Sequence, residues 1–279
     1  MKRGIVVSDI HCGSIYGLHP PNFISAAGAE VPQNPGQLYL WQCLLDFWTR
    51  KAKLKPPDFI IFNGDCIDGK QLAQHYTECN LPSLIDQKEA AIQSLRYAKE
   101  LFPNAKWYFT QGTEYHESKG AEAAEDVAMA LDAVRYSGPG PGRYTREVLD
   151  LDVEGIVLNA AHHISPTMGF YRATAADREG QWSAIAAKDE SKGIPKADII
   201  IRSHVHHFVH VEHESKHIFS TPCWQLQTRF MRKNSVYRML PTIGGVFLKI
   251  DGSAKGKGDD PASIRKEIYS LPPRKAVKL

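Results

Sequence analysis

Cysteine is scarce in this sequence, and its few copies follow no pattern typical of disulfide or metal chemistry. There are five cysteines among 279 residues, an odd number, and no two of them are spaced as Cys-x-x-Cys. Such a set excludes a disulfide framework and argues against a structural zinc site built on cysteine. We therefore expect a reducing, cytoplasmic setting. Cys12 and Cys66 adjoin polar motifs, but we expect them to be small, buried apolar side chains.

Long apolar runs and a strong charge imbalance are also missing. No apolar run approaches the 18 or so residues of a membrane-spanning helix. The opening run, Met1 to Ile10, is too short and is interrupted too early by Asp9 to predict a signal peptide. The net charge is only +3, so composition does not indicate a strongly basic nucleic-acid-binding surface. We expect no membrane contact, and the sequence leaves the oligomeric state open.

What the sequence does contain is a set of aspartates and histidines that follow apolar, strand-like runs. These residues are Asp9 and His11, then Asp65 and Asp68, and finally His204 and His206. Side chains two residues apart on a strand point to the same side, so each Asp-x-His or His-x-His pair is expected to aim at one point beyond a sheet edge. Carboxylate and imidazole ligands together suit Mn²⁺, Fe²⁺ or Zn²⁺.

The order of these motifs resembles that of the calcineurin-like metallophosphoesterase superfamily, over residues 1 to 225. That family carries Asp-x-His, Gly-Asp-x-x-Asp, Gly-Asn-His-Asp/Glu, an isolated His and Gly-His-x-His. All but the third are readable here, as Asp9 with His11, Gly64 to Asp68, the pair His162-His163, and His204 with His206. Ser203 replaces the glycine of the last motif. The resemblance implies an α/β fold, a four-layer αββα sandwich with the ligands on loops at one edge of two sheets.

The third motif departs from the family pattern. Where the family has Gly-Asn-His-Glu, this sequence reads Gly-Thr-Glu-Tyr-His-Glu over residues 112–117, as in members associated with viral and prophage branches. Two replacements for the missing asparagine ligand are open. Either Glu114 supplies a carboxylate, or Thr113 occupies the position and a water or carbonyl completes the site. We favour Glu114, because a carboxylate binds a hard divalent ion more tightly.

Carried over residue by residue, the resemblance implies two divalent metal ions, with Mn²⁺ the first choice and Fe, Zn or Ni the alternatives. One ion would be held by Asp9, His11 and His206, the other by His162, His204 and Glu114, and Asp65 would bridge them. The alignment places His162 at the ligand and His163 at the following glycine, although the residues alone do not rank the two. His207, His210 and His213 are predicted to be surface or cross-strand side chains.

The same resemblance implies the chemistry. Two ions held close together lower the pKa of a bridging water and create a hydroxide nucleophile, so the chain needs no Ser or Cys nucleophile. His116 matches the family histidine that protonates the leaving oxygen. Asp68 matches a carboxylate that orients a ligating imidazole, with a loop-capping role as an equal alternative.

The predicted function is that of a dinuclear metal-dependent phosphoesterase acting on phosphodiesters or phosphomonoesters. Nucleic acid or nucleotides are the first substrate hypothesis, supported by arginine and aromatic residues in the segment 165–193, which is equally compatible with an amphipathic helix. The competing hypothesis is a non-catalytic binding protein with a degenerate site. A phosphoserine phosphatase is disfavoured, because Gly69 stands after Asp68 where an arginine is expected.

Strand-like and helix-like runs alternate along the chain, as in a layered α/β fold. Helical spacing is expected at 38–51, 84–102 and 121–131, and the second of these helices is predicted to turn Ile85, Ile92, Leu95 and Ala98 inward. A long loop is expected at 12–37. We predict a metallophosphoesterase domain over residues 1–250, followed by a C-terminal strand and basic tail over 251–279.

Overall fold

Two β-sheets form the centre of the protein in a computed structural model, which describes residues 1–72, 75–137, 142–164, 171–214, 216–237, 239–257 and 259–273. The first sheet contains β1 (Lys2–Val7), β4 (Phe59–Asn63), β5 (Lys106–Thr110), β6 (Thr145–Arg146), β12 (Ile243–Ile250) and β13 (Ala262–Tyr269). The second contains β7 (Val148–Val153), β8 (Ile156–Ala161), β9 (Ile199–Arg202), β10 (Val209–His213) and β11 (Lys216–Ser220). A small hairpin of β2 (Phe23–Ile24) and β3 (Glu30–Val31) lies in the segment expected to be a loop.

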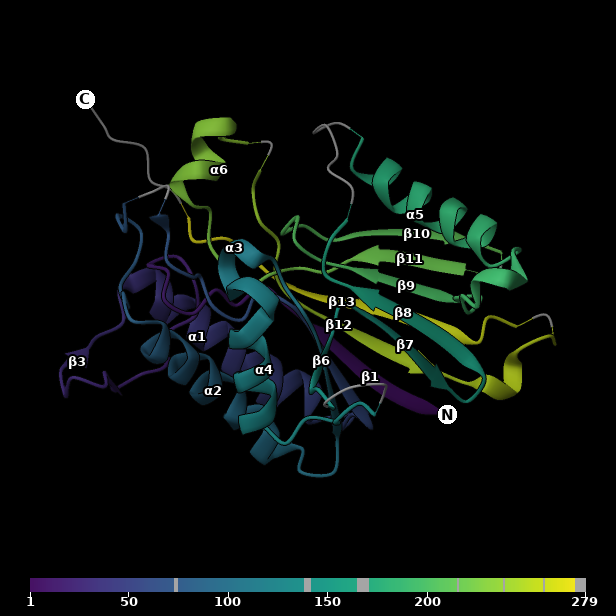
Figure 1. Ribbon diagram of the computed structural model, residues 1–279, viewed down its shortest axis with the longest axis horizontal. Helices are drawn as coiled ribbons and strands as arrows, with labels where there is room; N and C mark the ends of the chain where they lie inside the picture. The colour runs from purple at the N-terminus through teal and green to yellow at the C-terminus, as the bar shows by residue number, and fades with distance from the viewer. Residues whose placement is uncertain are drawn as a thin grey trace.

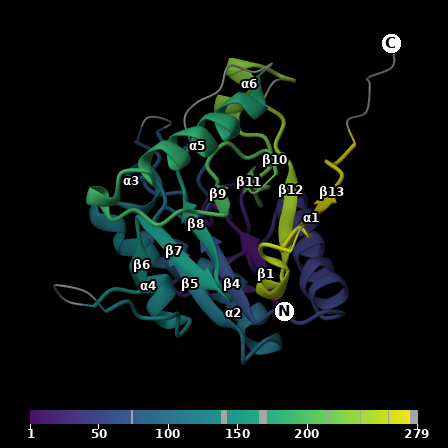
Figure 2. The same cartoon turned by 90° about the vertical axis from the view of Figure 1, so that its right-hand side faces the viewer.

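The helices are α1 (Pro35–Asp46), α2 (Leu84–Leu101), α3 (Glu114–Glu117), α4 (Glu122–Ala130), α5 (Arg172–Ala186) and α6 (Arg229–Asn234). A π-helical segment, Phe47–Ala52, continues α1, and short 3₁₀ turns cover Lys119–Ala121, Glu190–Lys192 and Gly252–Ala254. In Figure 1, α1, α2 and α4 lie on one side of the two sheets and α5 lies on the other, and Figure 2 shows the same layers from the side. The predicted αββα sandwich is confirmed.

Parallel pairing brings the important strand ends to one edge of each sheet. The first sheet has the order β13-β12-β1-β4-β5-β6, in which β1, β4 and β5 are mutually parallel. The second has the order β10-β11-β9-β8-β7, in which β8, β9 and β11 are mutually parallel. Every residue of β4 is buried, as expected for a parallel strand covered on both faces. The carboxyl ends of these parallel strands therefore lie side by side.

The apolar core consists of three clusters, one in each of the three spaces between the four layers of the fold. The largest lies between α1, α2, α4 and the first sheet, and contains the fully buried Trp48 and Trp107. A second layer lies between the sheets, where Val6 and Ile61 share a cluster with Leu158. The third and smallest lies under α5, which contributes Ala175 and Ala176 to the buried residues. Burial of central strands such as β4 and β11 makes their ends a rigid support for loops.

The helix α2 confirms most of its predicted inward face and contradicts one position. Ile92, Leu95 and Ala98 are buried, whereas Ile85 is 65% exposed. The first turn is oriented by polar contacts: Asp86 accepts a hydrogen bond from Ala26 N, and Gln87 bonds to the backbone of the loop after β4. Because these contacts lie on the opposite side of the turn, they direct Ile85 towards solvent. Helical spacing alone does not contain this information.

Some predictions fall partly beyond the described residues. Alternating Gly and Pro over residues 138–142 predict a turn between the two halves of one domain. All of this segment but Gly142 lies outside the described residues, and so does the end of the basic tail from residue 274. Within 251–279, β13 pairs along its whole length with β12, so this strand extends the first sheet. The division at residue 250 stays a prediction. All five cysteines are free thiols. Among the described helices, none has the length and apolarity needed to cross a membrane.

The contrast along α2 gives a stability prediction. Leu95→Ala removes a side chain that is 1% exposed and should lower the free energy of unfolding by about 2–5 kcal/mol, through lost burial and a residual cavity. Ile85→Ala is the matched control on the same helix, and we expect it to change stability by no more than about 0.5 kcal/mol. Urea unfolding followed by circular dichroism measures both, and equal losses would contradict the orientation of α2.

Candidate metal centre

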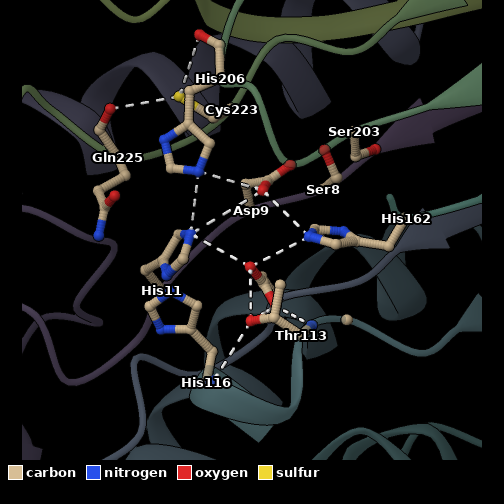
Figure 3. A network of polar contacts seen from close by, with 12 residues as sticks. Ser8, Asp9, His11, Thr113, His116, His162, Ser203, His206, Cys223 and Gln225 are labelled. Atoms are coloured by element: carbon tan, nitrogen blue, oxygen red, sulfur yellow. Dashed lines mark hydrogen bonds and ion pairs between the residues drawn. The ribbon is translucent and has the colours of Figure 1, made fainter. Parts of the chain in front are cut away.

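The polar residues predicted from the sequence converge where the two sheets meet. Asp9 and His11 follow β1, Asp65 follows β4, His162 follows β8, and the pair His204 and His206 follows β9. Figure 3 shows Asp9, His11, His162 and His206 pointing towards one another, with Thr113 and His116 on the same side. Each loop leaves the carboxyl end of a parallel strand, so convergence follows from the topology.

Backbone conformation aims these side chains, in a way the sequence did not reveal. Five of the six converging residues have positive φ angles: Asp9 at 53°, His11 at 44°, Asp65 at 55°, His204 at 70° and His206 at 57°. The expected mechanism, alternation along a strand, is therefore wrong for these pairs, because they lie past the strand ends in left-handed turns. Such conformations cost about 1–3 kcal/mol each and persist where surrounding structure holds them.

Backbone hydrogen bonds hold the first of these turns. Asp9 N donates to Gly64 O at 3.0 Å, and His11 N donates to Asp65 O at 3.2 Å. Asp9 O in turn accepts from Trp224 N at 3.0 Å. The loop after β1 is thus tied both to the loop after β4 and to the segment after β11, and its left-handed residues are supported from two sides.

The first ligand group consists of Asp9, His11 and His206. His206 Nε2 lies 3.2 Å from His11 Nε2 and 3.2 Å from Asp9 Oδ1, and His11 Nε2 lies 3.9 Å from Asp9 Oδ1. All three side chains are buried. Donor atoms about 2.0–2.2 Å from one tetrahedral ion are separated by roughly 3.3–3.5 Å. The spacing of this group therefore fits a single divalent ion.

The second group consists of Asp65, His162 and His204, whose candidate donor atoms lie within 4.8 Å of one another. His162 Nε2 is 3.1 Å from Asp65 Oδ2, and its Nδ1 is 2.7 Å from Asn63 O, which fixes the orientation of the ring. Asp65 Oδ2 is also 3.9 Å from His11 Nε2 of the first group. Asp65 thus stands between the two groups, as expected for a bridge.

Two buried carboxylates dominate the electrostatics. Burial lowers the pKa of His162, but the negative charges of Asp65 and Asp9 outweigh it and raise that pKa to about 10. Within the described residues, the Asp9 oxygens and His162 Nε2 make no hydrogen bond of regular geometry, although His206 Nε2 lies 3.2 Å from Asp9 Oδ1 and His162 Nε2 lies 3.1 Å from Asp65 Oδ2. Buried polar atoms without hydrogen bonds call for an explanation. Divalent cations supply one, so the residues present fit two metal ions.

The third loop favours Thr113 over Glu114. Glu114 is exposed at the start of α3, and no group of closely spaced candidate donors among the described residues includes it. Thr113 is buried, and its N and Oγ1 donate to Asp65 Oδ1 at 2.7 and 3.1 Å. Thr113 therefore lies next to Asp65, the residue predicted to bridge the two groups, and its hydroxyl orients that carboxylate.

Sequence reasoning missed Glu117, the residue that joins two of the loops. Its buried carboxylate accepts hydrogen bonds from Cys66 N at 2.9 Å and from Gly112 N at 2.6 Å. Burial and the charge of Asp65 raise the pKa of Glu117 to about 7. The signal was present, because Glu117 directly follows His116 as the last residue of the family motif does.

His116 and Asp68 lie at the mouth of the site. Asp68 Oδ1 is 3.2 Å from His11 Nδ1, so this carboxylate lies behind the ring whose Nε2 faces the ligands. The backbone oxygen of Asp68 is 2.9 Å from His116 Nδ1. His116 also places a ring nitrogen within 4.8 Å of donor atoms on His11 and Asp65. Both residues are thus positioned for the roles expected of them, which remain predictions.

The other predicted alternatives are placed as follows. His162 is buried in the second group, whereas His163 is exposed beside it, with its ring 5.5 Å from that of His162. Cys12 and Cys66 are buried thiols, and burial raises the pKa of Cys12 to about 12. Neither belongs to a group of candidate metal donors among the described residues.

Beneath the ligands, a chain of fully buried side chains links both sheets. Asn63 Oδ1 accepts from Thr110 Oγ1 at 2.6 Å, and Asn63 Nδ2 donates to Ser203 Oγ at 2.6 Å. Thr221 Oγ1 continues the chain, 2.7 Å from Ser203 Oγ and 2.7 Å from Ser8 Oγ. Ser203, the replacement for the family glycine, is therefore the link between the sheets.

The close approach at Gly64 gives a prediction with a matched control. Gly64 has φ +82°, and a Cβ there would lie 2.4 Å from His162 Nδ1, whereas Gly155 has φ +83° and open space. Ala at either site costs about 1–2 kcal/mol of backbone strain. We expect Gly64→Ala alone to displace His162 and lower metal content per chain. Equal metal content in the two variants, measured by inductively coupled plasma mass spectrometry, would contradict this geometry.

The third loop gives another prediction. Thr113→Val removes the hydroxyl that bonds to Asp65 while keeping the side chain's shape, and should weaken metal binding about 10- to 100-fold. Glu114→Gln should leave it unchanged, because Glu114 is exposed. Isothermal titration with Mn²⁺ measures both variants. The reverse result would identify Glu114 as the ligand.

Comparison with known proteins finds solved structures of low sequence identity to this chain. No protein-family model matches the chain, and no curated protein matches its sequence. Similar solved structures include Vps29 from Entamoeba histolytica complexed with Zn²⁺, at 14% identity, covering 95% of this chain and 98% of that one with TM-score 0.41. An archaeal phosphodiesterase matches at 12% identity, 96% and 99% coverage and TM-score 0.41. Such values carry no argument about activity. On the layered architecture and the placement of the motif residues, the resemblance to the calcineurin-like metallophosphoesterases is confirmed at the level of the fold.

Proposed function

We propose that the protein is a dinuclear metal-dependent phosphoesterase that hydrolyses phosphodiester or phosphomonoester bonds. The observation that carries the proposal is the pair of adjoining ligand groups, Asp9 with His11 and His206, and Asp65 with His162 and His204. When bound, two divalent ions at such a site supply charge stabilisation for the phosphoryl group and activation of water. Mn²⁺ is the first choice, with Fe, Zn or Ni as alternatives.

The protein's own residues then bind, orient and transfer protons. Asp65 lies between the two groups and keeps them adjacent, and Thr113 fixes its carboxylate. His116 is proposed to protonate the leaving oxygen, since its ring lies at the open side of the ligands with Nδ1 held by the Asp68 backbone. Gln225 Nε2 contacts Asp68 Oδ1 at 3.3 Å and helps keep this carboxylate against His11.

The cavity in front of the ligands supports a substrate with an aromatic part. Its volume is about 450 Å³, within the range of small-molecule sites. One side is formed by Asp65, His116 and other polar residues of the site. The lining also includes Tyr115, Phe230, Met231 and Met239. Tyr115 and Phe230 are about half exposed, and the ring of Tyr115 makes an edge contact with that of His116 at 4.9 Å. Aromatic side chains at such a cavity support stacking against a base. Nucleotides or single-stranded nucleic acid fit this combination.

Aromatic residues in the segment 165–193, first considered for substrate contact, lie away from this cavity. Tyr171 and Trp182, at the start of and within α5, are exposed on the outer layer, and the cavity is lined by other residues. Arg232 of α6 donates to Tyr16 Oη at 2.7 Å and to Gln227 O at 2.6 Å, which makes it a brace for α6. The substrate hypothesis therefore depends on the two aromatic residues that line the cavity, Tyr115 and Phe230. We place this activity in the cytoplasm, a setting that free thiols favour.

The test combines metal content with two ester classes. Wild-type protein in Mn²⁺ is expected to hold two ions per chain and to hydrolyse bis-p-nitrophenyl phosphate or p-nitrophenyl phosphate. Asp65→Ala should lose both metal and turnover. His116→Ala should keep its metal and lose turnover by about 10²- to 10⁴-fold.

A different outcome would favour the competing function. At most one ion per chain with no turnover of either ester would indicate a non-catalytic binding protein, which the missing asparagine ligand favours. Phe230→Ala separates the substrate hypothesis from the reaction class. It should raise KM for a nucleotide ester while leaving hydrolysis of glycerol 2-phosphate, which has no aromatic ring, unchanged.

A further inference from the structure

A second group of metal-binding side chains lies at the opposite end of the five-stranded sheet. His210 and Glu212 are two residues apart on β10 and so share one face of the strand. Glu212 pairs in register with His217 of β11, which lies near the start of that strand. The dinuclear site, by contrast, lies beyond the end of β11, where Trp224 bonds to Asp9. The two groups are therefore separate.

The donor atoms of this group converge on one point. His210 Nε2 is 3.1 Å from His217 Nδ1, and the two rings stack with centroids 5.3 Å apart. Together with a carboxylate oxygen of Glu212, these nitrogens lie within 4.8 Å of one another. Nitrogen donors on one tetrahedral zinc ion are roughly 3.3–3.4 Å apart, so little movement is needed to bind an ion.

A carboxylate behind His217 completes the pattern of a metal ligand. His217 Nε2 lies 3.1 Å from Asp260 Oδ1, and the same oxygen accepts a hydrogen bond from Ala262 N at 2.9 Å. His217 is only 6% exposed, so its ring is held in place. Metal-ligating histidines commonly use their second nitrogen in this way, which orients the ring and raises its basicity. Nδ1 is left directed at His210.

The surroundings favour a cation and leave it access. Five acidic residues line a cavity at this edge together with His217: Asp198, Glu212, Glu214, Asp259 and Asp260. Two lysines line it as well, but Lys255 Nζ is paired with Asp198 Oδ2 at 2.9 Å, and Lys216 Nζ donates to Gly180 O and Ser183 Oγ of α5 at 3.5 and 3.3 Å. His210 is half-buried and Glu212 is exposed, so an ion reaches them without opening the sheet.

We propose that His210, Glu212 and His217 form a mononuclear site for Zn²⁺ or a similar transition-metal ion, with Asp260 orienting His217. Two imidazoles and one carboxylate are a common zinc ligand set, and a water completes the coordination. Because Asp260 precedes β13 while the ligands lie on β10 and β11, the bound ion braces the second sheet against the edge of the first. The site is independent of the phosphoesterase proposal.

The test removes the dinuclear site first. In an Asp9→Asn, Asp65→Asn background, Co²⁺ titration is followed by its visible absorption, which reports tetrahedral coordination, and Zn²⁺ binding is followed by calorimetry. One equivalent should bind. Adding His210→Ala or Glu212→Gln should weaken this binding at least ten-fold. His213→Ala is the matched control, because it lies on β10 but contacts Asp177 of α5 at 2.9 Å on the other face, and it should bind like the background.

Further readouts separate site loss from misfolding. The variants should show the background's thermal unfolding without metal and lose only the rise in Tm that Zn²⁺ gives. In the wild-type background, His210→Ala should leave ester hydrolysis in Mn²⁺ unchanged. The proposal is overturned if the background binds no ion, or if His210→Ala and His213→Ala bind equally well. The histidine pair would then be a cross-strand hydrogen bond alone.

Discussion

The need to stabilise two buried carboxylates governs the centre of this protein. Asp9 and Asp65 are at most 1% exposed, and an isolated buried charge costs far more than a domain's net stability. Four imidazoles surround them, two loops supply backbone hydrogen bonds, and the left-handed turns aim them at one another. Each of these features is unfavourable or neutral alone. Together they form a site in which bound cations would balance the negative charges of Asp9 and Asp65.

A continuous network of buried polar side chains supports this site. The buried chain from Thr110 through Asn63, Ser203 and Thr221 to Ser8 satisfies each of its members while it crosses from one sheet to the other. Asn63 also fixes His162 through its backbone oxygen. A satisfied buried network specifies one packing of the sheets more strictly than apolar contacts do. The ligand geometry is thereby coupled to sheet packing.

Much of the fold was predictable because its signals are local. Buried parallel strands such as β4 and β9 read as short β-branched or aromatic runs, and the ligands follow those runs directly. The exposure of Ile85 was not predictable, because it depends on polar contacts between α2 and loops distant in sequence. The strand β10 was not predicted, because histidine and glutamate interrupt its apolar pattern, whereas a C-terminal strand within 251–279 was predicted and corresponds to β13.

The sequence indicated which residues come together at the candidate site, but it indicated less about how they are arranged. Motif order indicated Asp9, His11, Asp65, His162, His204 and His206, and all of them converge. The choice between Thr113 and Glu114 was not decidable from residue types, since a carboxylate is the better ligand in isolation. Only the position of Asp65 shows which of the two reaches the centre. Glu117 was overlooked because it holds two loops together by accepting hydrogen bonds from backbone N–H groups. The position of these groups cannot be inferred from the sequence.

The left-handed backbone conformation at the ligands also limits which substitutions this site tolerates. Asparagine, aspartate and glycine tolerate that conformation best, whereas β-branched residues strongly resist it. Replacing Asp9 or Asp65 with asparagine therefore changes charge with little effect on the loop, while a threonine or valine would also disturb the backbone. Laboratory evolution towards another metal preference should therefore accept asparagine at these two positions more readily than a β-branched residue.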